Sequence, residues 1–184
     1  NDIQFTTSGT FTFGATGISG AAVQLSQDAT ATANLKDNFL TLPGMAAGLW
    51  VRPTAAPALE TVQQLVQVRS DDSLNTVSLF IDSSLLPHLS WTTASGSGEV
   101  EFKQLLPLAS WTHLAFSVSG ETVSLYEDGV AVASAAAPDL PQALSLSAVI
   151  VNHVAGSGNP GFTGLMDTMV IYNKVVDFGQ ADDK

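Results

Sequence analysis

Short runs in which apolar and polar residues alternate recur along most of the chain, and Gly, Pro, Asp and Ser punctuate them. Alternation with a period of two is typical of a β-strand that buries one face, whereas an amphipathic helix repeats its apolar positions every three to four residues. Residues 59–66 fit either period. The predicted strands cover residues 10–13, 22–25, 38–42, 62–69, 76–81, 99–103, 111–118, 121–127, 130–134, 145–151 and 162–172. So many short strands predict an all-β fold of two packed antiparallel sheets.

The strongest turn signal is Asp128-Gly129, which lies between two alternating runs. Asp-Gly at such a point favours a two-residue β-hairpin turn. The strands 121–127 and 130–134 are therefore expected to pair with each other.

The alternation also assigns side chains to faces, because successive side chains of a strand point to opposite sides. Leu114, Phe116 and Val118 share one face of their strand, and Val123 and Leu125 share one face of the next. Neighbouring strands that each bury one face build one layer of a β-sandwich.

Composition is consistent with a large core in a single domain. The chain has 184 residues, of which 45% are hydrophobic and 12% charged. Sandwiches of this length commonly form one domain. We expect one sandwich over residues 1–176, followed by a loose polar tail over residues 177–184.

Charge and cysteine content exclude several functions. Seventeen acidic and six basic residues give a net charge of −11, which disfavours nucleic acid and anionic lipid as partners and favours cations such as calcium. There is no cysteine, so disulfides and thiolate metal sites are excluded. No apolar run has transmembrane length, so membrane insertion is not expected.

Four segments carry patterns of a known group of domains. Residues 111–129 contain Trp-Thr-His, an apolar strand, a turn and Leu-Tyr-Glu-Asp-Gly, and residues 162–172 contain Phe-Thr-Gly-Leu-Met-Asp followed by an apolar run and Tyr. Residues 18–25 and 45–53 contain Gly-Ala-Ala-Val and Trp-Val-Arg-Pro. In this order, the segments resemble the laminin-G-like and pentraxin-like jelly rolls of the concanavalin A-like group. The pentraxin branch normally carries a cysteine pair, so the broader laminin-G-like group is favoured.

This resemblance implies a two-sheet antiparallel jelly roll that binds ligands at a sheet face or a loop rim, often with calcium. Glycans and proteins are both common ligands of the group. The same fold also hosts glycoside hydrolases and lyases, so the fold alone does not determine the function.

Asp167 is the first candidate metal ligand. It follows the Phe-x-Gly pattern, and the resemblance implies that a carboxylate there can hold a structural calcium ion near the start of the chain. Calcium would need several further oxygen ligands, which backbone carbonyls could provide. The alternative is an Asp whose hydrogen bonds fix the neighbouring loop.

A second calcium site is expected at a loop rim. Asp71, Asp72 and Asn75 precede the strand 76–81, where some laminin-G-like domains carry a calcium-binding Asp. In those domains a further ligand comes from the loop before Phe-x-Gly. That loop of this chain offers, as metal or ligand contacts, Asn152, His153 and Asn159. The alternative is ordinary turn chemistry, which also favours Asp, Asn and Ser.

Tryptophan and histidine residues are further candidate ligand contacts. Trp91 lies outside the four family-like segments, and an exposed tryptophan there would mark a sugar-binding surface. His88, His113 and His153 show neither a His-x-His nor a His-Glu-x-x-His spacing, so zinc is not expected.

An enzyme of this fold would need two positioned carboxylates. Glu99 and Glu101 lie two residues apart and therefore on one face of a strand. The family's Glu-x-Asp-x-Glu strand is missing, so a solvated outer face is the favoured interpretation of the pair.

We therefore expect a non-enzymatic, extracellular binding or adhesion module within a larger surface or secreted protein. It would recognise a glycan or a protein partner with the help of calcium. Two alternatives stay open, namely a glycan-active hydrolase or lyase and a purely architectural assembly domain. The oligomeric state is left open by the sequence.

Overall fold

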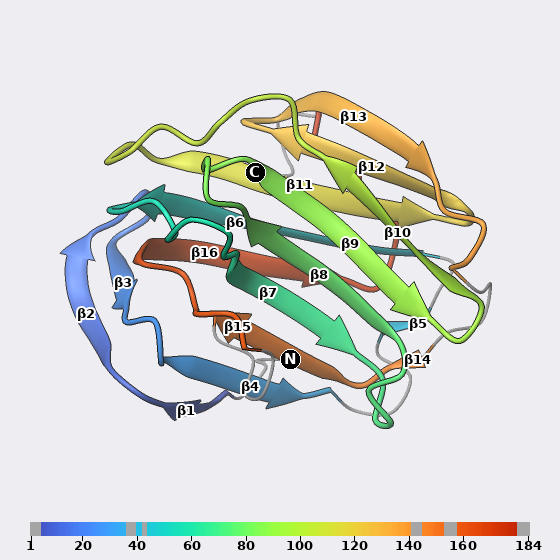
Figure 1. The fold of residues 1–184 in the computed structure, drawn as a ribbon, viewed down its shortest axis with the longest axis horizontal. Helices are drawn as coiled ribbons and strands as arrows, with labels where there is room; N and C mark the ends of the chain where they lie inside the picture. Colours follow the sequence, from blue (N-terminus) through green and yellow to red (C-terminus); the bar gives the residue numbers. More distant parts are fainter. Residues whose placement is uncertain (1–4, 36–39, 42–43, 141–144, 153–157, 180–184) are drawn as a thin grey trace.

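The computed structural model describes residues 5–35, 40–41, 44–140, 145–152 and 158–179 (Figure 1). Throughout these residues the chain forms strands, turns and loops but no helix. The described part accordingly offers no helical segment that is long and apolar enough to cross a membrane.

Two seven-stranded antiparallel sheets and one two-stranded sheet make up the described structure. The first sheet runs, in spatial order, β1 (Thr6–Ser8), β4 (Thr30–Asn34), β15 (Ala148–Asn152), β7 (Gln63–Arg69), β8 (Thr76–Ile81), β9 (Pro87–Thr93) and β10 (Gly96–Glu101). The second runs β13 (Val130–Ala136), β12 (Thr122–Glu127), β11 (Thr112–Ser119), β6 (Gly44–Pro53), β16 (Gly164–Tyr172), β3 (Ala21–Leu25) and β2 (Phe11–Thr16). The small sheet pairs β14 (Ser145–Leu146) with β5 (Leu40–Thr41). The predicted sandwich is confirmed.

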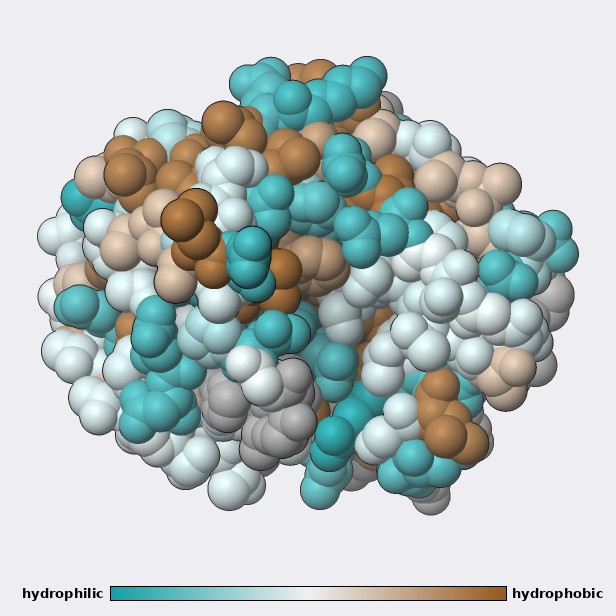
Figure 2. All heavy atoms as spheres, in the orientation of Figure 1, coloured by the Kyte–Doolittle hydropathy of each residue, from teal (hydrophilic) through white to brown (hydrophobic). Residues whose placement is uncertain are grey.

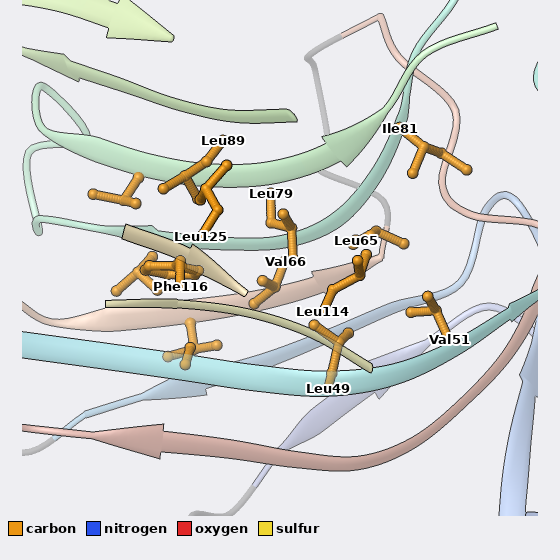
Figure 3. Close-up of a cluster of buried hydrophobic side chains, with 14 of the residues drawn as sticks. Leu49, Val51, Leu65, Val66, Leu79, Ile81, Leu89, Leu114, Phe116 and Leu125 are labelled. Atoms are coloured by element: carbon orange, nitrogen blue, oxygen red, sulfur yellow. The ribbon is translucent and has the colours of Figure 1, made fainter. Parts of the chain in front are cut away.

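The core lies between the inner faces of the two seven-stranded sheets. In Figure 3, Leu79 of β8 and Leu89 of β9 meet Leu114 and Phe116 of β11 across the sandwich, with Leu49 of β6 beside them. Each of these side chains is almost fully buried. Burying an apolar side chain of this size contributes about 1.5–3 kcal/mol, so the alternating pattern supplies the main stabilisation.

The four family-like segments are neighbours in space. They supply β3, β6, the hairpin of β11 and β12, and β16, which stand side by side in the order β12-β11-β6-β16-β3. The segments that carry the resemblance therefore form the continuous middle of the second sheet.

The hairpin turn at Asp128-Gly129 is confirmed. The two residues have φ angles of 49° and 79°, as a turn that matches the twist of a hairpin requires. The Asp128 carboxylate also accepts a hydrogen bond of 2.8 Å from the backbone N–H of His113. The turn is thereby attached to the beginning of β11.

The sequence did not predict every strand, and it predicted two separate strands as one. The strands β1 and β4 lie where no run was predicted, because threonine and alanine give weak alternation. The single run predicted at 145–151 is divided between β14 and β15. Residues 63–66, the second half of the ambiguous run 59–66, lie in β7.

The predicted boundary of the domain at residue 176 is wrong. Phe178 is fully buried, and its ring lies 5.9, 5.7 and 6.2 Å from the rings of His113, Tyr126 and Tyr172. Together with Val176 it covers the outer face of the second sheet at Ala46 and Ala115. The packed domain therefore extends at least to Phe178. The burial of this one large apolar ring stabilises the segment more than its polar neighbours favour exposure to water.

Candidate functional site

Trp91 does not form an exposed platform. Its side chain is 4% exposed and belongs to the core between the sheets. Opposite it on β10 stands Gly98, where an added Cβ would come within 2.2 Å of the indole ring. The absence of a side chain at Gly98 thus makes room for the tryptophan, and the expected exposed sugar-binding role of Trp91 is wrong.

The turn containing Asp71, Asp72 and Asn75 is held by its own hydrogen bonds. Asp72 Oδ1 accepts hydrogen bonds from the Ser70 hydroxyl and from the backbone N–H of Leu74. The hydrogen bond from Ser70, and after it the one from Leu74, lower the pKa of Asp72. Asn75 donates from its side-chain amide to Ser70 Oγ over 3.4 Å. This is the turn chemistry that the sequence left as the alternative to a metal loop.

Asn152 serves as a framework residue. It is fully buried, and its amide nitrogen donates hydrogen bonds of 2.8 Å to the backbone carbonyls of Ser26 and Ala29. Its carbonyl oxygen accepts a hydrogen bond from the backbone N–H of Phe162. Both amide hydrogens and the oxygen are thereby used, so the side chain is not available to a ligand at the surface.

Within the described residues, the two predicted rim loops lie apart. The strand β15 pairs with β7 so that Ala148 faces Arg69, and the hydroxyl of Ser147 donates to Asp71. The Asp71–Asn75 turn therefore lies at the beginning of β15, whereas Asn152 lies at its other end. Asn159 is half-buried and lies in the connection between β15 and β16, after Asn152. His153 lies outside the described residues.

Asp167, on β16, fixes the turn before β3. Its Oδ2 atom accepts hydrogen bonds of 2.7 and 3.0 Å from the backbone N–H groups of Ile18 and Ser19. Partial burial favours the neutral acid, but these bonds and one from the Thr168 hydroxyl outweigh it and lower the pKa of Asp167. The turn also requires a glycine, because a Cβ on Gly17 would lie 2.4 Å from Oδ2.

These positions fit a calcium ion poorly. Calcium takes six to eight oxygen ligands, whereas the oxygens of Asp72 and Asp167 described above face N–H and O–H donors of the chain itself. Donor hydrogens carry partial positive charge and occupy the directions from which a cation would approach. Calcium binding at these residues stays a prediction from the sequence.

An apolar cavity of about 260 Å³ opens at the edge of the sandwich beside Asp167. Phe5, just before β1, and Phe11 and Phe13 of β2 line it, together with Val151 and Met166. Its wall joins both sheets, because β1 and β2 belong to different sheets. Apart from the Asp167 carboxylate and threonine hydroxyls, the lining offers few polar groups.

The outer face of β7 to β10 combines polar and aromatic side chains. One row crosses the four strands through Gln67, Ser78, Ser90 and Glu99, which are aligned by the strand register. The Gln67 amide donates a 3.0 Å hydrogen bond to Ser78. Figure 2 looks onto this side of the molecule, where neutral and hydrophilic atoms cover most of the right half and hydrophobic atoms gather toward the upper left.

The neighbouring row contains an imidazole among acidic groups. Phe80, His88 and Glu101 are aligned across β8, β9 and β10. The rings of Phe80 and His88 stack with centroids 5.0 Å apart and planes within 5°. His88 Nδ1 lies 2.9 Å from Glu99 Oε1, and Nε2 lies 3.5 Å from Asp82 Oδ2.

Asp82, in the turn after β8, is positioned by that turn. The Asp82 Oδ1 atom accepts hydrogen bonds from the hydroxyl and N–H of Ser84 and from the N–H of Leu86. Partial burial alone would raise its pKa, but these hydrogen bonds, together with the nearby His88 imidazole, lower the pKa of Asp82. The carboxylate is therefore held charged beside the imidazole.

Sequence reasoning missed this cluster because it depends on register. Glu99 and Glu101 were assigned to a solvated face, which is where they lie, and His88 was considered alone. The signal that could have joined them is the short connection at residues 94–95, which makes β9 and β10 a hairpin and sets Glu101 opposite His88.

Comparisons with known proteins agree with this architecture. Residues 19–178 match a laminin G family model described as the concanavalin A-like lectin/glucanases superfamily. No match was found among the curated protein sequences.

Several solved structures share the fold at low identity. Domain 4 of an extracellular GH43 arabinanase from Geobacillus stearothermophilus, in complex with arabinotriose, is 22% identical, with a TM-score of 0.72 over 96% of this chain and 81% of that one. Domains LG4-5 of the mouse laminin α1 chain are 13% identical, with a TM-score of 0.70 over 86% of this chain and 44% of that one.

A toxin structure is similar as well. Botulinum neurotoxin type C, described with an interaction with two ganglioside molecules, is 9% identical, with a TM-score of 0.76 over 96% of this chain and 44% of that one. The chain thus spans less than half of the laminin and toxin chains. With the family match covering most of its length, the chain belongs to the concanavalin A-like lectin/glucanases superfamily.

Proposed function

We propose that this chain is an extracellular, non-enzymatic domain that binds a glycan on the outer face of β7 to β10, as part of a larger surface or secreted protein. The observation that carries the proposal is the row of Gln67, Ser78, Ser90 and Glu99 beside the ring of Phe80. Binding sites commonly combine apolar or aromatic surface with a few placed polar groups.

The chemistry of this face suits a hydroxyl-rich ligand. The half-buried Ser90 hydroxyl and Gln67 amide can donate and accept, and the exposed Glu99 carboxylate accepts, while the buried Ser78 holds the Gln67 amide in place. A sugar presents donors and acceptors on the same carbon and also apolar C–H surface, which can rest against an aromatic ring. Because the strands fix the spacing of these groups, little ordering would be required on binding.

Related structures support the ligand class. The arabinanase domain was solved with arabinotriose, and the type C neurotoxin is described with gangliosides. Their identities to this chain are 22% and 9%, so the shared property is the fold, and the binding surface has to be argued from this chain. A protein ligand is the competing possibility, because the same fold also occurs in domains LG4-5 of the mouse laminin α1 chain.

A glycan-active enzyme is the second candidate, and one observation favours it. A carboxylate oxygen of Glu99 and one of Glu101 lie within 4.8 Å of each other, near the spacing of about 5–5.5 Å between the carboxyl groups of retaining glycosidases. However, both side chains are exposed on the same strand. A general acid usually lies in an apolar pocket, and neither glutamate does.

A glycan array followed by titration of the best ligand tests the proposal. Ser90→Arg would place a bulky side chain on the outer face of the first sheet, and Ser124→Arg would do the same on the second sheet. We expect at least about tenfold weaker binding for Ser90→Arg, which is a loss of about 1.4 kcal/mol, and no change for Ser124→Arg. Equal effects of the two variants, or no bound glycan, would contradict the site. Product formation from the bound glycan would favour the enzyme.

A further inference from the structure

We propose that His88, Glu99 and Glu101 form a binding site for a divalent transition-metal ion of the zinc type. The site lies at the edge of the outer face, on β9 and β10, and the proposal does not depend on glycan binding. It differs from the calcium sites that the sequence suggested, both in position and in ligand chemistry.

The strand register brings the three side chains together. Glu101 stands directly opposite His88, and Glu99 stands opposite Ser90, one position of the same face further along. One potential ligand atom from each of the three residues lies within 4.8 Å of the other two. Both glutamates are exposed, so they can rotate to metal–ligand bonds of about 2.0–2.2 Å without disturbing the core.

The imidazole is held in place before any ion binds. His88 is 7% exposed, and its ring stacks in parallel on Phe80. Its Nδ1 atom points toward the glutamates, while Nε2 faces Asp82 Oδ2 at 3.5 Å, too far for a good hydrogen bond. Nε2 is also buried from solvent and lacks a hydrogen-bond partner.

This arrangement on the far side of the ring is an independent indication of a metal ligand. Histidines that bind metals usually direct their second nitrogen at a carboxylate, which fixes the tautomer and orients the ring. Asp82 occupies that position, and its own turn holds it there through Ser84 and Leu86. A solvated surface histidine would need neither the stacked ring nor the anchored carboxylate.

The donor set selects the class of ion. One imidazole nitrogen and two carboxylate oxygens suit zinc and its first-row neighbours, whereas calcium and magnesium prefer oxygen ligands alone. Three protein ligands leave a fourth tetrahedral position for water or for an oxygen of a ligand. The negative charges of Asp82, Glu99 and Glu101 surround the ring and would attract a cation.

Protons compete with the metal for the same nitrogen. Without an ion, Nδ1 is at hydrogen-bond distance from Glu99, and a metal would replace the proton between them. Ligand groups must be deprotonated to bind a metal, so the ion can bind only after the proton has left the imidazole nitrogen. The charged groups facing the ring are Asp82, Glu99 and Glu101, and all three stabilise the ion or the proton that occupies the site.

Isothermal titration of the untagged 184-residue chain with ZnCl2 tests this site. We expect one-to-one binding that Glu99→Gln and Glu101→Gln each weaken at least about tenfold, the usual scale for altering the surroundings of a metal site. Asp82→Asn should weaken it by about 10–100-fold through the orientation of His88. Glu121→Gln, an exposed glutamate in the β11–β12 turn, is the matched control and should leave the affinity unchanged.

Cobalt provides a second readout that a merely structural role would not change. Co2+ in a site with a nitrogen ligand and low coordination number gives intense visible absorption, and Glu101→Gln should abolish it. Because the two glutamates are exposed, their variants should keep the wild-type circular dichroism spectrum even where His88→Gln fails to fold. Absence of zinc binding, or binding that Glu99→Gln and Glu101→Gln leave unchanged, would overturn the proposal.

Discussion

Asn152 allows the sharpest test of the described framework, because the sequence and the structure give it different roles. In Asn152→Ala the backbone carbonyls of Ser26 and Ala29 lose their donor, and the N–H of Phe162 loses its acceptor. A buried polar group left without a partner costs about 1–3 kcal/mol. Two of the three bonds are fully buried, so we expect destabilisation by about 4 kcal/mol.

Backbone conformation adds a separate contribution. Asn152 has a φ of 71°, a left-handed conformation that alanine adopts at a cost of about 1–2 kcal/mol and glycine adopts freely. Asn152→Gly should therefore be less destabilising than Asn152→Ala by about 1 kcal/mol, although both lose the same hydrogen bonds. Asn75→Ala is the matched control, because the side chain of Asn75 donates one long hydrogen bond, to Ser70. We expect this substitution to lower the free energy of unfolding by less than about 1 kcal/mol.

Urea unfolding followed by tryptophan fluorescence measures these differences. We expect a lower urea midpoint at an unchanged m-value, with the largest decrease for Asn152→Ala, a smaller one for Asn152→Gly and the smallest for Asn75→Ala. A loss below about 1 kcal/mol for Asn152→Ala would refute the reasoning, because removing two fully buried hydrogen bonds and one partly buried one should cost more than that. A surface role for Asn152 would then be the better interpretation.

Three further predictions concern stability. Phe178→Ala should cost about 3–5 kcal/mol in urea unfolding, whereas the exposed Val175→Ala should change stability by less than about 0.5 kcal/mol; equal effects would restore the predicted boundary at residue 176. Asp167→Ala should cost about 1–2 kcal/mol at pH 7, and because the folded pKa is lowered from 3.8, the difference from wild type should shrink as the pH falls below that value. Burial, with the charge of Asp128, raises the pKa of Glu127 above 4.5, so Glu127→Gln should raise the melting temperature at pH 7 but not at pH 4; a loss at pH 7 would contradict this sign.

The sequence predicted the sandwich because its signals are local. The strand 76–81 coincides with β8, and the Asp128-Gly129 turn follows from two adjacent residues. Trp91 shows where local reasoning could have gone further, since it alternates in phase with the buried Leu89 and therefore points inward. What made room for its ring, Gly98 on the next strand, depends on register.

The candidate sites were harder to predict because they join residues that are distant in sequence. Asp167 contacts a turn about 148 residues earlier, so the sequence could name the residue but not its partners. The two rim loops were expected to meet because some laminin-G-like domains take calcium ligands from both, but antiparallel pairing places the Asp71–Asn75 turn and Asn152 at opposite ends of β15. The cluster around His88 likewise exists only once β9 and β10 are aligned.

Mapping a bound glycan on the backbone amides by NMR tests the central claim most directly. With the best array ligand, the account predicts saturable shifts concentrated in β7 to β10, around Ser78, Ser90 and Glu99, with no new reducing ends over the time of the titration. Shifts concentrated on the second sheet or at the loop ends, or cleavage of the glycan, would contradict the claim that this domain binds a glycan on its outer face without turning it over.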